Sequence, residues 1–296
     1  MRILVIGNSG QVARSLREAA ALREDIVLDS SSQPEVDVLE PSSIEARLAR
    51  FRPDVVINPA AYTAVDRAET EPGKAFAINR DGARSVAAAA ANLGLPIIHL
   101  STDYVFDGTK ETPYAEGDAV NPQSVYGRSK LEGERAVMQV NPRHIVLRTS
   151  WVYAPFGSNF VRTMLRLAGE RSRLSVVDDQ FGCPTYAPDI ADAILAIAVK
   201  VAGGQTAYAG VTHLAGPDAL TWCGFARSIF QGVAERGGRS IAVDPITTAD
   251  YPTLAVRPAN SRLSTDRLAS LFGVTLPAMK NSLAKCLDRL MLAGEE

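Results

Sequence analysis

The sequence is poor in cysteine, with only three in 296 residues. Cys183, Cys223 and Cys286 are odd in number and widely scattered, so they predict neither a disulfide framework nor a metal cluster. This pattern is typical of a protein from a reducing compartment. We therefore expect a cytoplasmic location and no bound metal.

Long apolar runs and an excess of charge of either sign are also missing. The apolar start RILVI ends at a glycine and is too short for a signal peptide, and no stretch approaches the roughly 20 apolar residues that cross a bilayer. The net charge is −2, and no basic run is present. We therefore expect neither a membrane nor a nucleic acid as a partner.

What the sequence does contain is an alternation of short apolar runs and amphipathic stretches. The apolar runs predict strands at 2–6, 25–28, 54–57, 96–101 and 144–149, and the stretches between them predict helices at about 11–23, 42–51, 72–93 and 124–140. Strands that are apolar throughout are buried on both faces, and strand–helix repetition implies right-handed crossovers between parallel strands. The first half therefore predicts an α/β fold with a doubly wound, Rossmann-type parallel sheet.

The second half has a different texture. Helices are expected at about 158–170, 188–200, 221–235 and 276–292, but the strands between them are fewer and the loops are longer. We therefore expect a dinucleotide-binding domain over residues 1–150. Residues 151–296 would form mainly a smaller C-terminal α/β substrate domain, with some segments crossing back to the first domain.

A glycine-containing loop directly follows the first predicted strand. Gly7, Gly10 and Ala13 have the spacing G-x-x-G-x-x-A, which is typical of a dinucleotide-binding turn. The first glycine permits the tight turn, the second lets the backbone approach a pyrophosphate, and the small third residue lets the helix pack on the strand. The pyrophosphate would lie at the helix N-terminus, where free N–H groups and the helix dipole favour anions.

The end of the second predicted strand bears on the choice of cofactor. Asp29 lies about 20 residues after Gly7, which is the spacing expected for an acid that binds the adenosine ribose. Such a carboxylate would favour NADH by repelling the 2′-phosphate of NADPH. An ordinary strand-end carboxylate would look the same, and the serines at 30–32 could instead donate to a phosphate. The sequence therefore leaves NADPH and NADH open.

The stretch NPAAYTAVDRAE, residues 58–69, follows the third predicted strand. Its small residues Ala60 and Ala61 would let the backbone pass close to a flat ligand, and Thr63 offers a hydroxyl. A tight turn packed on a helix would have the same composition, so this stretch by itself favours neither interpretation.

Tyr126 and Lys130 are four residues apart and share one face of a predicted helix. The pair alone is unspecific, because a half-buried aromatic beside a solvated lysine has the same spacing. Its surroundings strengthen the functional interpretation. STDYVFDG places Ser101, Thr102 and Asp103 at the carboxyl edge of the predicted sheet, where doubly wound folds bind ligands.

These residue types suit the reduction of a carbonyl group. A phenol with a pKa near 10 is a weak acid, but a nearby ammonium and a positive nicotinamide ring would lower that pKa. Tyr126 could then give a proton to a carbonyl oxygen while hydride arrives at its carbon. Thr102 would hydrogen-bond the same oxygen, and Lys130 would also anchor the nicotinamide ribose.

In these motifs and in further sequence segments, the chain resembles the extended short-chain dehydrogenases/reductases and, within them, the dTDP-4-dehydrorhamnose reductase family. The resemblance covers essentially the whole chain and is carried by GNSGQVA, RPDVVINPAAYTAVDRAE, STDYVFDG, VYGRSKLEGE, RTSWVYAPFGSNF, VVDDQFGCPT and RPANSRL. It implies reduction of the 4-keto group of dTDP-4-dehydro-β-L-rhamnose by NADPH or NADH. The implied product is dTDP-L-rhamnose, a precursor in carbohydrate biosynthesis.

The resemblance also implies roles for individual positions of this chain. The implied catalytic set is Thr102, Tyr126 and Lys130. The implied substrate contacts are Thr102, Asp103, Trp151, Asn159 and Arg257. The implied cofactor contacts are Gly7, Gly10, Gln11, Val12, Asp29, Asp37, Val38, Ala61, Tyr62, Thr63, Tyr126 and Lys130. Among these, Asp29 would bind the adenosine ribose, and Asp37 and Val38 the adenine.

Two departures from related patterns matter. Nucleotide-sugar dehydratases of the same superfamily read T-D-E, whereas this chain reads Thr102-Asp103-Tyr104, and the missing glutamate argues against dehydration. Some family members carry a glutamate in the first helix that helps to hold magnesium at a dimer interface. Ser15 stands at that place here, beside Arg14, so we expect no metal-bridged dimer, although a homodimer of another kind stays open.

Other activities remain open from the sequence alone. The chain could reduce a related dTDP-4-keto-6-deoxy sugar or form the other C4 epimer. An epimerase that retains NAD would share the fold. A non-catalytic, nucleotide-binding regulatory subunit would share it too, but such a protein could dispense with the Thr/Tyr/Lys set, which is intact here.

Overall fold

A six-stranded parallel sheet forms the centre of the protein in a computed structural model that describes residues 1–204 and 207–292. The strand order is β10-β5-β4-β3-β1-β2, and every neighbouring pair is parallel. The strands are β1 (Arg2–Ile6), β2 (Val27–Ser31), β3 (Val55–Asn58), β4 (Ile97–Thr102), β5 (His144–Thr149) and β10 (Gly210–His213). All five strands predicted in the first half are present, and the predicted fold class is confirmed.

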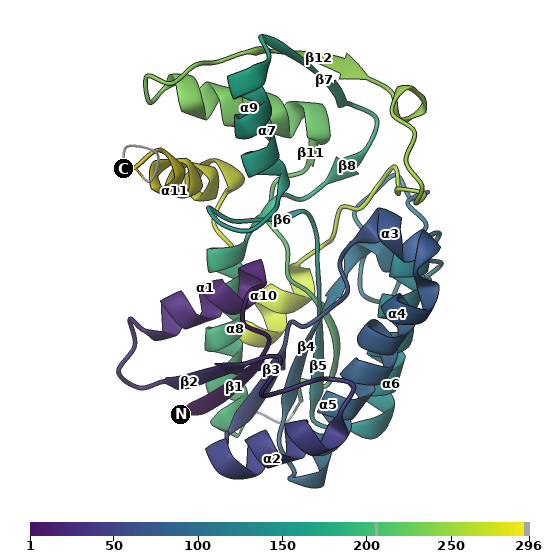
Figure 1. The fold of residues 1–296 in the computed structure, drawn as a ribbon, viewed down its shortest axis with the longest axis vertical. Helices are drawn as coiled ribbons and strands as arrows, with labels where there is room; N and C mark the ends of the chain where they lie inside the picture. Colours follow the sequence, from purple (N-terminus) through teal and green to yellow (C-terminus); the bar gives the residue numbers. More distant parts are fainter. Residues whose placement is uncertain (205–206, 293–296) are drawn as a thin grey trace.

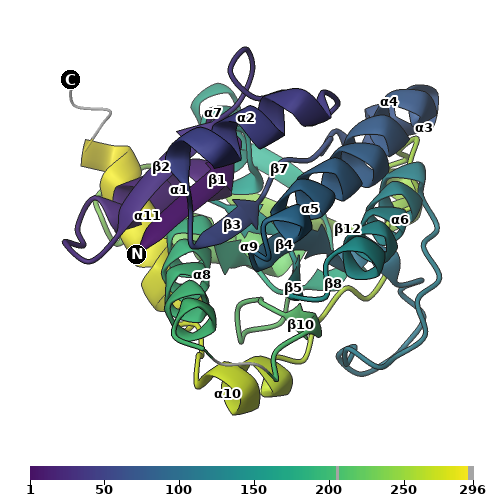
Figure 2. The same cartoon turned by 90° about the horizontal axis from the view of Figure 1, so that it is seen from below.

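Helices cover both faces of this sheet (Figures 1 and 2). One face carries α1 (Gln11–Ala20), α8 (Ala187–Ala202) and α10 (Asp266–Phe272). The other carries α2 (Pro41–Phe51), α5 (Ala83–Asn92) and α6 (Val125–Val140). Alternate residues of β1 serve the two faces, since Ile3 and Val5 pack on the side of α1, α8 and α10, and Leu4 and Ile6 pack on the side of α2, α5 and α6. This two-sided burial explains why the strands are apolar throughout.

The helix predicted at 72–93 is interrupted. The structure has α3 (Val65–Thr70) before it, and then α4 (Pro72–Phe76), a π-helical turn η1 (Ala77–Gly82) and α5 in succession. Asn79 in the π turn is buried and hydrogen-bonds the backbone of Tyr62 and the hydroxyl of Ser129. A single wider turn hardly changes the apolar period, so the sequence did not indicate it.

The second predicted strand is displaced along the chain. It was expected at 25–28 and lies at 27–31, so Asp29 is inside β2 and not at its end. The residue at the end of the strand is Ser31. The polar Asp-Ser-Ser sequence hid the strand, because an edge strand needs fewer apolar residues than a central one.

A second apolar cluster lies above the carboxyl edge of the sheet, in the upper part of Figure 1. It contains α7 (Phe160–Glu170), α9 (Trp222–Ala234) and α11 (Met279–Leu292), together with the parallel pair β7 (Arg173–Val177) and β12 (Ala242–Ile246). Two short ladders join it, β6 (Val152–Tyr153) with β9 (Thr185–Tyr186) and β8 (Phe181–Gly182) with β11 (Leu220–Thr221). Strands of two residues have no readable period, so these were not predicted.

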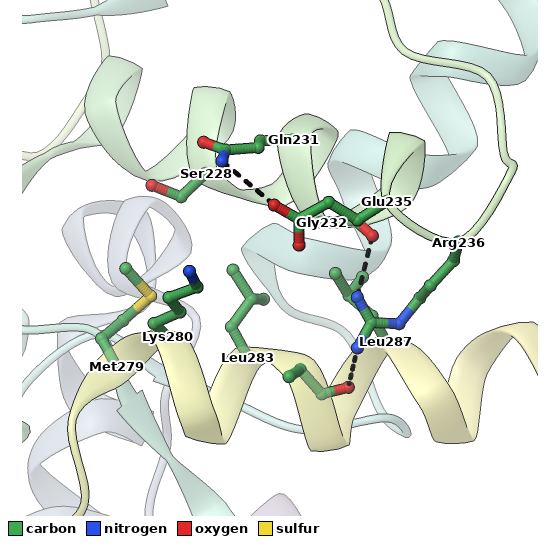
Figure 3. A pocket seen from close by; sticks show the side chains of 10 residues that line it. Ser228, Gln231, Gly232, Glu235, Arg236, Met279, Lys280, Leu283 and Leu287 are labelled. Carbon is green, nitrogen blue, oxygen red and sulfur yellow. Dashed lines mark hydrogen bonds between the residues drawn. The ribbon is translucent and has the colours of Figure 1, made fainter.

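Helices α9 and α11 of this cluster lie side by side around a hollow of about 290 Å³ (Figure 3). Arg236 bridges the two helices. Its guanidinium donates to the carbonyl oxygen of Gly232 on α9 at 2.9 Å and to that of Ala284 on α11 at 3.2 Å. The hollow therefore belongs to the packing of the second cluster and lies apart from the edge of the sheet.

The packing of α6 on the π turn gives a first prediction. A Cβ at Gly133 would lie 2.0 Å from the carbonyl oxygen of Asn79, so Gly133→Ala must push the helix away from the backbone of the turn. We expect a loss of about 1–3 kcal/mol in the free energy of unfolding, measured by urea titration. Gly169→Ala in α7 is the matched control, because nothing lies within 4 Å of the added Cβ and alanine favours the helix. Equal stability of Gly133→Ala and the wild type would contradict this packing.

Candidate active site

A cavity of about 780 Å³ opens at the carboxyl edge of the sheet. Its lining comes from the loops that follow β1, β3, β4 and β5 and from one face of α6. It includes the point between β1 and β3 where the strand order reverses, which is where doubly wound sheets bind ligands. The predicted site residues that line it are Gly7, Gly10, Gln11, Val12, Ala61, Thr63, Thr102, Asp103, Tyr126, Lys130 and Trp151.

The glycine turn has the geometry that a bound pyrophosphate requires. Gly7 has φ of 126°, a conformation that glycine adopts without strain. The hydroxyl of Ser30 lies 2.6 Å from both the Gly7 carbonyl oxygen and the Asn8 side-chain oxygen, so it can donate to either of them and fixes the turn from β2. Gly10 begins α1 without a side-chain cap, so the first N–H groups of the helix remain available to an anion.

Buried polar atoms without partners point to the same ligand. The hydroxyls of Ser101 and Thr149 line the cavity, are buried, and have no hydrogen-bond partner within the described part of the chain. Buried polar groups are normally satisfied, so these atoms are suited to a polar ligand. Together with the glycine turn, the residues present therefore fit a dinucleotide.

The predicted adenosine contacts lie outside the lining of the cavity. Asp29 is paired with Arg47 of α2. One carboxylate oxygen of Asp37 accepts from Gln33 at 2.6 Å, and Val38 packs against Gly82. Because Arg47 offsets the charge of Asp29, the argument that this carboxylate would repel a 2′-phosphate loses its basis.

Tyr62 also lies outside the lining, although its neighbours Ala61 and Thr63 are in it. Its hydroxyl donates to Glu71 at 2.7 Å. Its backbone is held at both its N–H and its carbonyl by Asn79, at 2.8 and 3.1 Å. The π turn therefore fixes the path of the loop past the cavity, and no pattern in the sequence indicates this role for Asn79.

Thr102, Tyr126 and Lys130 lie together in the cavity wall. Tyr126 and Lys130 share one face of α6, and Thr102 is the last residue of β4. The Thr102 hydroxyl lies close enough to the Tyr126 hydroxyl to act on its pKa. Lys130 is only 2% exposed, which excludes the alternative of a solvated lysine.

Burial dominates the proton affinities of this set. It raises the pKa of Tyr126 well above 10, with Asp103 and Tyr104 acting in the same direction and the Thr102 hydrogen bond acting against it. Burial lowers the pKa of Lys130 to about 8, and Glu134 opposes this shift. The expected lowering of the Tyr126 pKa by Lys130 is therefore not found in the protein alone. The ammonium instead donates to the Leu100 carbonyl at 2.7 Å.

A buried ion pair lies next to Lys130. Glu134, one helical turn further along α6, accepts two hydrogen bonds from Arg148 of β5, at 2.9 and 2.7 Å. Both side chains are almost fully buried. Sequence reasoning did not single out this pair, although the spacing of Lys130 and Glu134 placed them on one helical face.

Asp103 is buried and surrounded by hydroxyl groups. Its carboxylate accepts from Thr102 at 2.8 Å and from Ser150 at 3.0 Å, and the Ser261 hydroxyl lies close enough to act on its pKa. Burial raises the pKa of Asp103 to about 6 in spite of these hydrogen bonds. The sequence did not indicate Ser150 or Ser261, because both reach Asp103 from distant parts of the chain.

Trp151 lines the cavity in an unusual backbone conformation, with φ of 46°. Its ring stacks on Trp222 of α9, with centroids 3.4 Å apart and an angle of 5° between the planes. Gly182 lies against it, and a Cβ there would lie 2.2 Å from the ring. A non-glycine residue with positive φ is strained, and such strain gathers at functional sites.

The two remaining predicted substrate contacts lie outside the lining. Asn159 caps α7, and its amide donates to Gln11 Oε1 at 2.9 Å, which connects the second cluster to the glycine turn. Arg257 pairs with Asp66 at 3.0 Å and lies near Tyr104, where it opposes the rise of the Tyr104 pKa. Both side chains are thus held by protein partners beside the cavity.

The position that bears on a bridging metal is occupied by a buried serine. The Ser15 hydroxyl donates to the Gln11 carbonyl within α1, at 2.8 Å. Within residues 1–204 and 207–292 no group of three His, Cys, Asp or Glu side chains is placed to hold a metal ion. None of the helices in that part of the chain is both long and apolar enough to cross a membrane.

Comparison with known proteins agrees with this site. The family model described as RmlD substrate binding domain matches residues 1–292. A dTDP-4-dehydrorhamnose reductase of Sinorhizobium fredii is 48% identical over 100% of both chains. A probable dTDP-4,6-dihydroxy-2-methyloxan-3-one 4-ketoreductase of Streptomyces antibioticus is 39% identical over 90% of this chain and 88% of its own.

A solved structure gives the same result. The dTDP-4-dehydrorhamnose reductase of Bacillus anthracis in complex with NADP superimposes with a TM-score of 0.89 at 32% identity, covering 97% of this chain and 98% of its own. Since the family model matches nearly the whole chain and the glycine turn shares a cavity with the Thr/Tyr/Lys set, the chain belongs to the dTDP-4-dehydrorhamnose reductase family.

Proposed function

We propose that the protein reduces the 4-keto group of dTDP-4-dehydro-β-L-rhamnose to give dTDP-L-rhamnose, with NADPH or NADH as reductant. The observation that carries the proposal is the single cavity in which Thr102, Tyr126 and Lys130 lie beside the glycine turn. The 48% identity with a reductase of this name supports the choice of substrate.

The site residues divide the work of the reaction. The cofactor, when bound, supplies a hydride to the carbonyl carbon. Tyr126 donates its hydroxyl proton to the carbonyl oxygen, and Thr102 hydrogen-bonds the same oxygen and holds it in reach. The Lys130 ammonium donates to the Leu100 carbonyl and is stabilised by the charge of Glu134. It would bind the nicotinamide ribose and supply a positive charge near the phenol.

The choice of reduction over dehydration rests on Tyr104. It occupies the place of the dehydratase glutamate, and burial raises its pKa to about 12, so it cannot act as a base at neutral pH. Asp103 alone remains of the acid pair, and its carboxylate is occupied by hydroxyl groups of the protein.

Substrate and cofactor contacts follow from the placement of the residues. We propose that the pyrophosphate is held by Gly7, Gly10, Gln11 and Val12. The backbone at Ala61 and Thr63 would run along the nicotinamide half of the cofactor. Trp151 would contact the sugar. Asn159 and Arg257 would reach the nucleotide only after exchange of their present protein partners.

We propose further that residues 1–150 mainly bind the dinucleotide and that residues 151–296 mainly bind the substrate. Helices α8 and α10 and strand β10 return from the second part to the sheet. A homodimer would form without a metal bridge, because Ser15 offers no carboxylate. The three cysteines in this part of the chain are free and buried, which suits a cytoplasmic location.

A related 4-keto sugar is the second candidate substrate, favoured by the similarity to the Streptomyces ketoreductase. The two are separated by following absorbance at 340 nm with each freshly prepared dTDP-4-keto sugar and identifying the product by NMR. Oxidation of NADPH or NADH with dTDP-L-rhamnose as product supports the first candidate. Bound cofactor without turnover would favour a regulatory subunit instead.

Removal of the Tyr126 hydroxyl tests the proton donor. We expect Tyr126→Phe to lower kcat by about 10²–10⁴-fold, the usual worth of a general acid, and to leave cofactor affinity nearly intact. The matched control is Tyr153→Phe, because the Tyr153 hydroxyl is buried in the second cluster without a hydrogen-bond partner in the described residues. Near-wild-type turnover of Tyr126→Phe would show that the proton comes from elsewhere.

The pH profile tests the charge on Lys130. The pKa of Lys130 is lowered to about 8, so the ammonium is present below that pH and is lost as the pH rises through it. We expect kcat/KM for the keto sugar to fall above about pH 8. Lys130→Met should have a low activity without this fall. If the variant keeps the fall, another group causes it.

A further inference from the structure

The Thr102 hydroxyl lies at a junction of three polar groups. It donates to the Asp103 carboxylate at 2.8 Å, accepts from the Tyr104 N–H at 3.2 Å, and lies beside the Tyr126 hydroxyl in the cavity wall. A hydroxyl has one proton to donate. When that proton goes to Asp103, Thr102 can only accept, and it has no proton for a substrate oxygen.

The protonation of Asp103 decides which way this hydrogen bond runs. An ionised carboxylate only accepts, so Thr102 and Ser150 must both donate to it, and the Ser261 hydroxyl lies beside it. A neutral carboxyl has one O–H, and Thr102 can accept it. Burial at 2% exposure favours the neutral form, and the three hydroxyl groups favour the ionised one.

We propose that Asp103 is a positioning residue that sets the direction of the Thr102 hydroxyl. A neutral Asp103 donates to Thr102 and leaves the Thr102 proton free to hydrogen-bond the substrate's carbonyl oxygen, whereas an ionised Asp103 withdraws that proton. The inference rests on the proposed reductase function, and it gives Asp103 a role other than the predicted sugar contact.

The other titratable groups that face Asp103 do not change charge in the same range. Tyr126 comes from α6, Tyr104 follows β4, and Cys183 follows β8. Burial raises the pKa of each, to about 12 for Tyr104 and about 11 for Cys183. The pKa of Asp103 is about 6, and a titration near that pH can therefore be assigned to it.

The test compares the pH profile of kcat for the wild type and Asp103→Asn, at saturating NADPH and keto sugar, from about pH 5.5 to 9. We expect wild-type kcat to fall about 3- to 10-fold as the pH rises through the Asp103 titration, the worth of one hydrogen bond, with little change in KM. Asp103→Asn, whose amide donates at every pH, should lack this fall in kcat and keep the separate fall of kcat/KM near pH 8. A wild type without the lower fall, or an Asp103→Asn variant that retains it, overturns the proposal.

A second variant separates positioning from mere packing. Ser150→Ala removes a hydroxyl that donates to the Asp103 carboxylate at 3.0 Å and is separate from Thr102, so it should raise the pKa of Asp103 and move the lower fall to higher pH. A fall that stays at the wild-type pH would overturn the assignment to Asp103.

Failure of the proposed function would be seen separately. A wild type that reduces none of the dTDP-4-keto sugars at any pH disproves that function. The inference is then tested by ¹³C NMR of carboxyl-labelled aspartate, with the Asp103 signal assigned by its loss in Asp103→Asn. We expect this signal to titrate well above free aspartate and to move further up in Thr102→Val. A signal that titrates like free aspartate overturns the inference.

Discussion

The close approach of α6 to the backbone segments on either side of it is the constraint on which the site depends. A Cβ at Gly127 would lie 2.2 Å from the Tyr104 carbonyl, and one at Gly133 would lie 2.0 Å from the Asn79 carbonyl. These two positions seat the helix at a fixed depth between the loop after β4 and the π turn. The position of α6 therefore fixes where Tyr126 and Lys130 lie relative to Thr102 in the cavity wall. The same packing holds the π turn in place, from which Asn79 hydrogen-bonds the backbone of Tyr62.

This depth has an electrostatic cost that the surrounding groups offset. Burial of Lys130 lowers its pKa, and the nearby carboxylate of Glu134 opposes part of this decrease. Two hydrogen bonds from Arg148 fix the orientation of the Glu134 carboxylate, so its charge stays in place beside Lys130. A buried pair of this kind adds little stability by itself, but it fixes where charge lies in the cavity wall.

The sequence predicted those parts of the site that depend on local spacing. The glycine turn, the Tyr126–Lys130 pair and the polar end of β4 are each short patterns next to an apolar run, and the structure brings them into one cavity. What could not be predicted depends on contacts between distant segments. Ser150 and Ser261 around Asp103, and the stacking of Trp222 on Trp151, bring together residues that no periodicity connects. Asp29 was misplaced for a different reason, because a polar edge strand has no apolar run to mark its end.

The return of β10 to the sheet has a consequence for the growing chain. Until Gly210–His213 has been synthesised, β5 is the edge of the sheet, and its N–H and C=O groups have no neighbour on that side. Helix α8, which packs on the same face as α1, is also absent until Ala187–Ala202 has been synthesised. An open apolar edge is a template for pairing with other chains. A nascent chain that has completed only β1 to β5 is therefore exposed to edge-to-edge aggregation until β10 has been added.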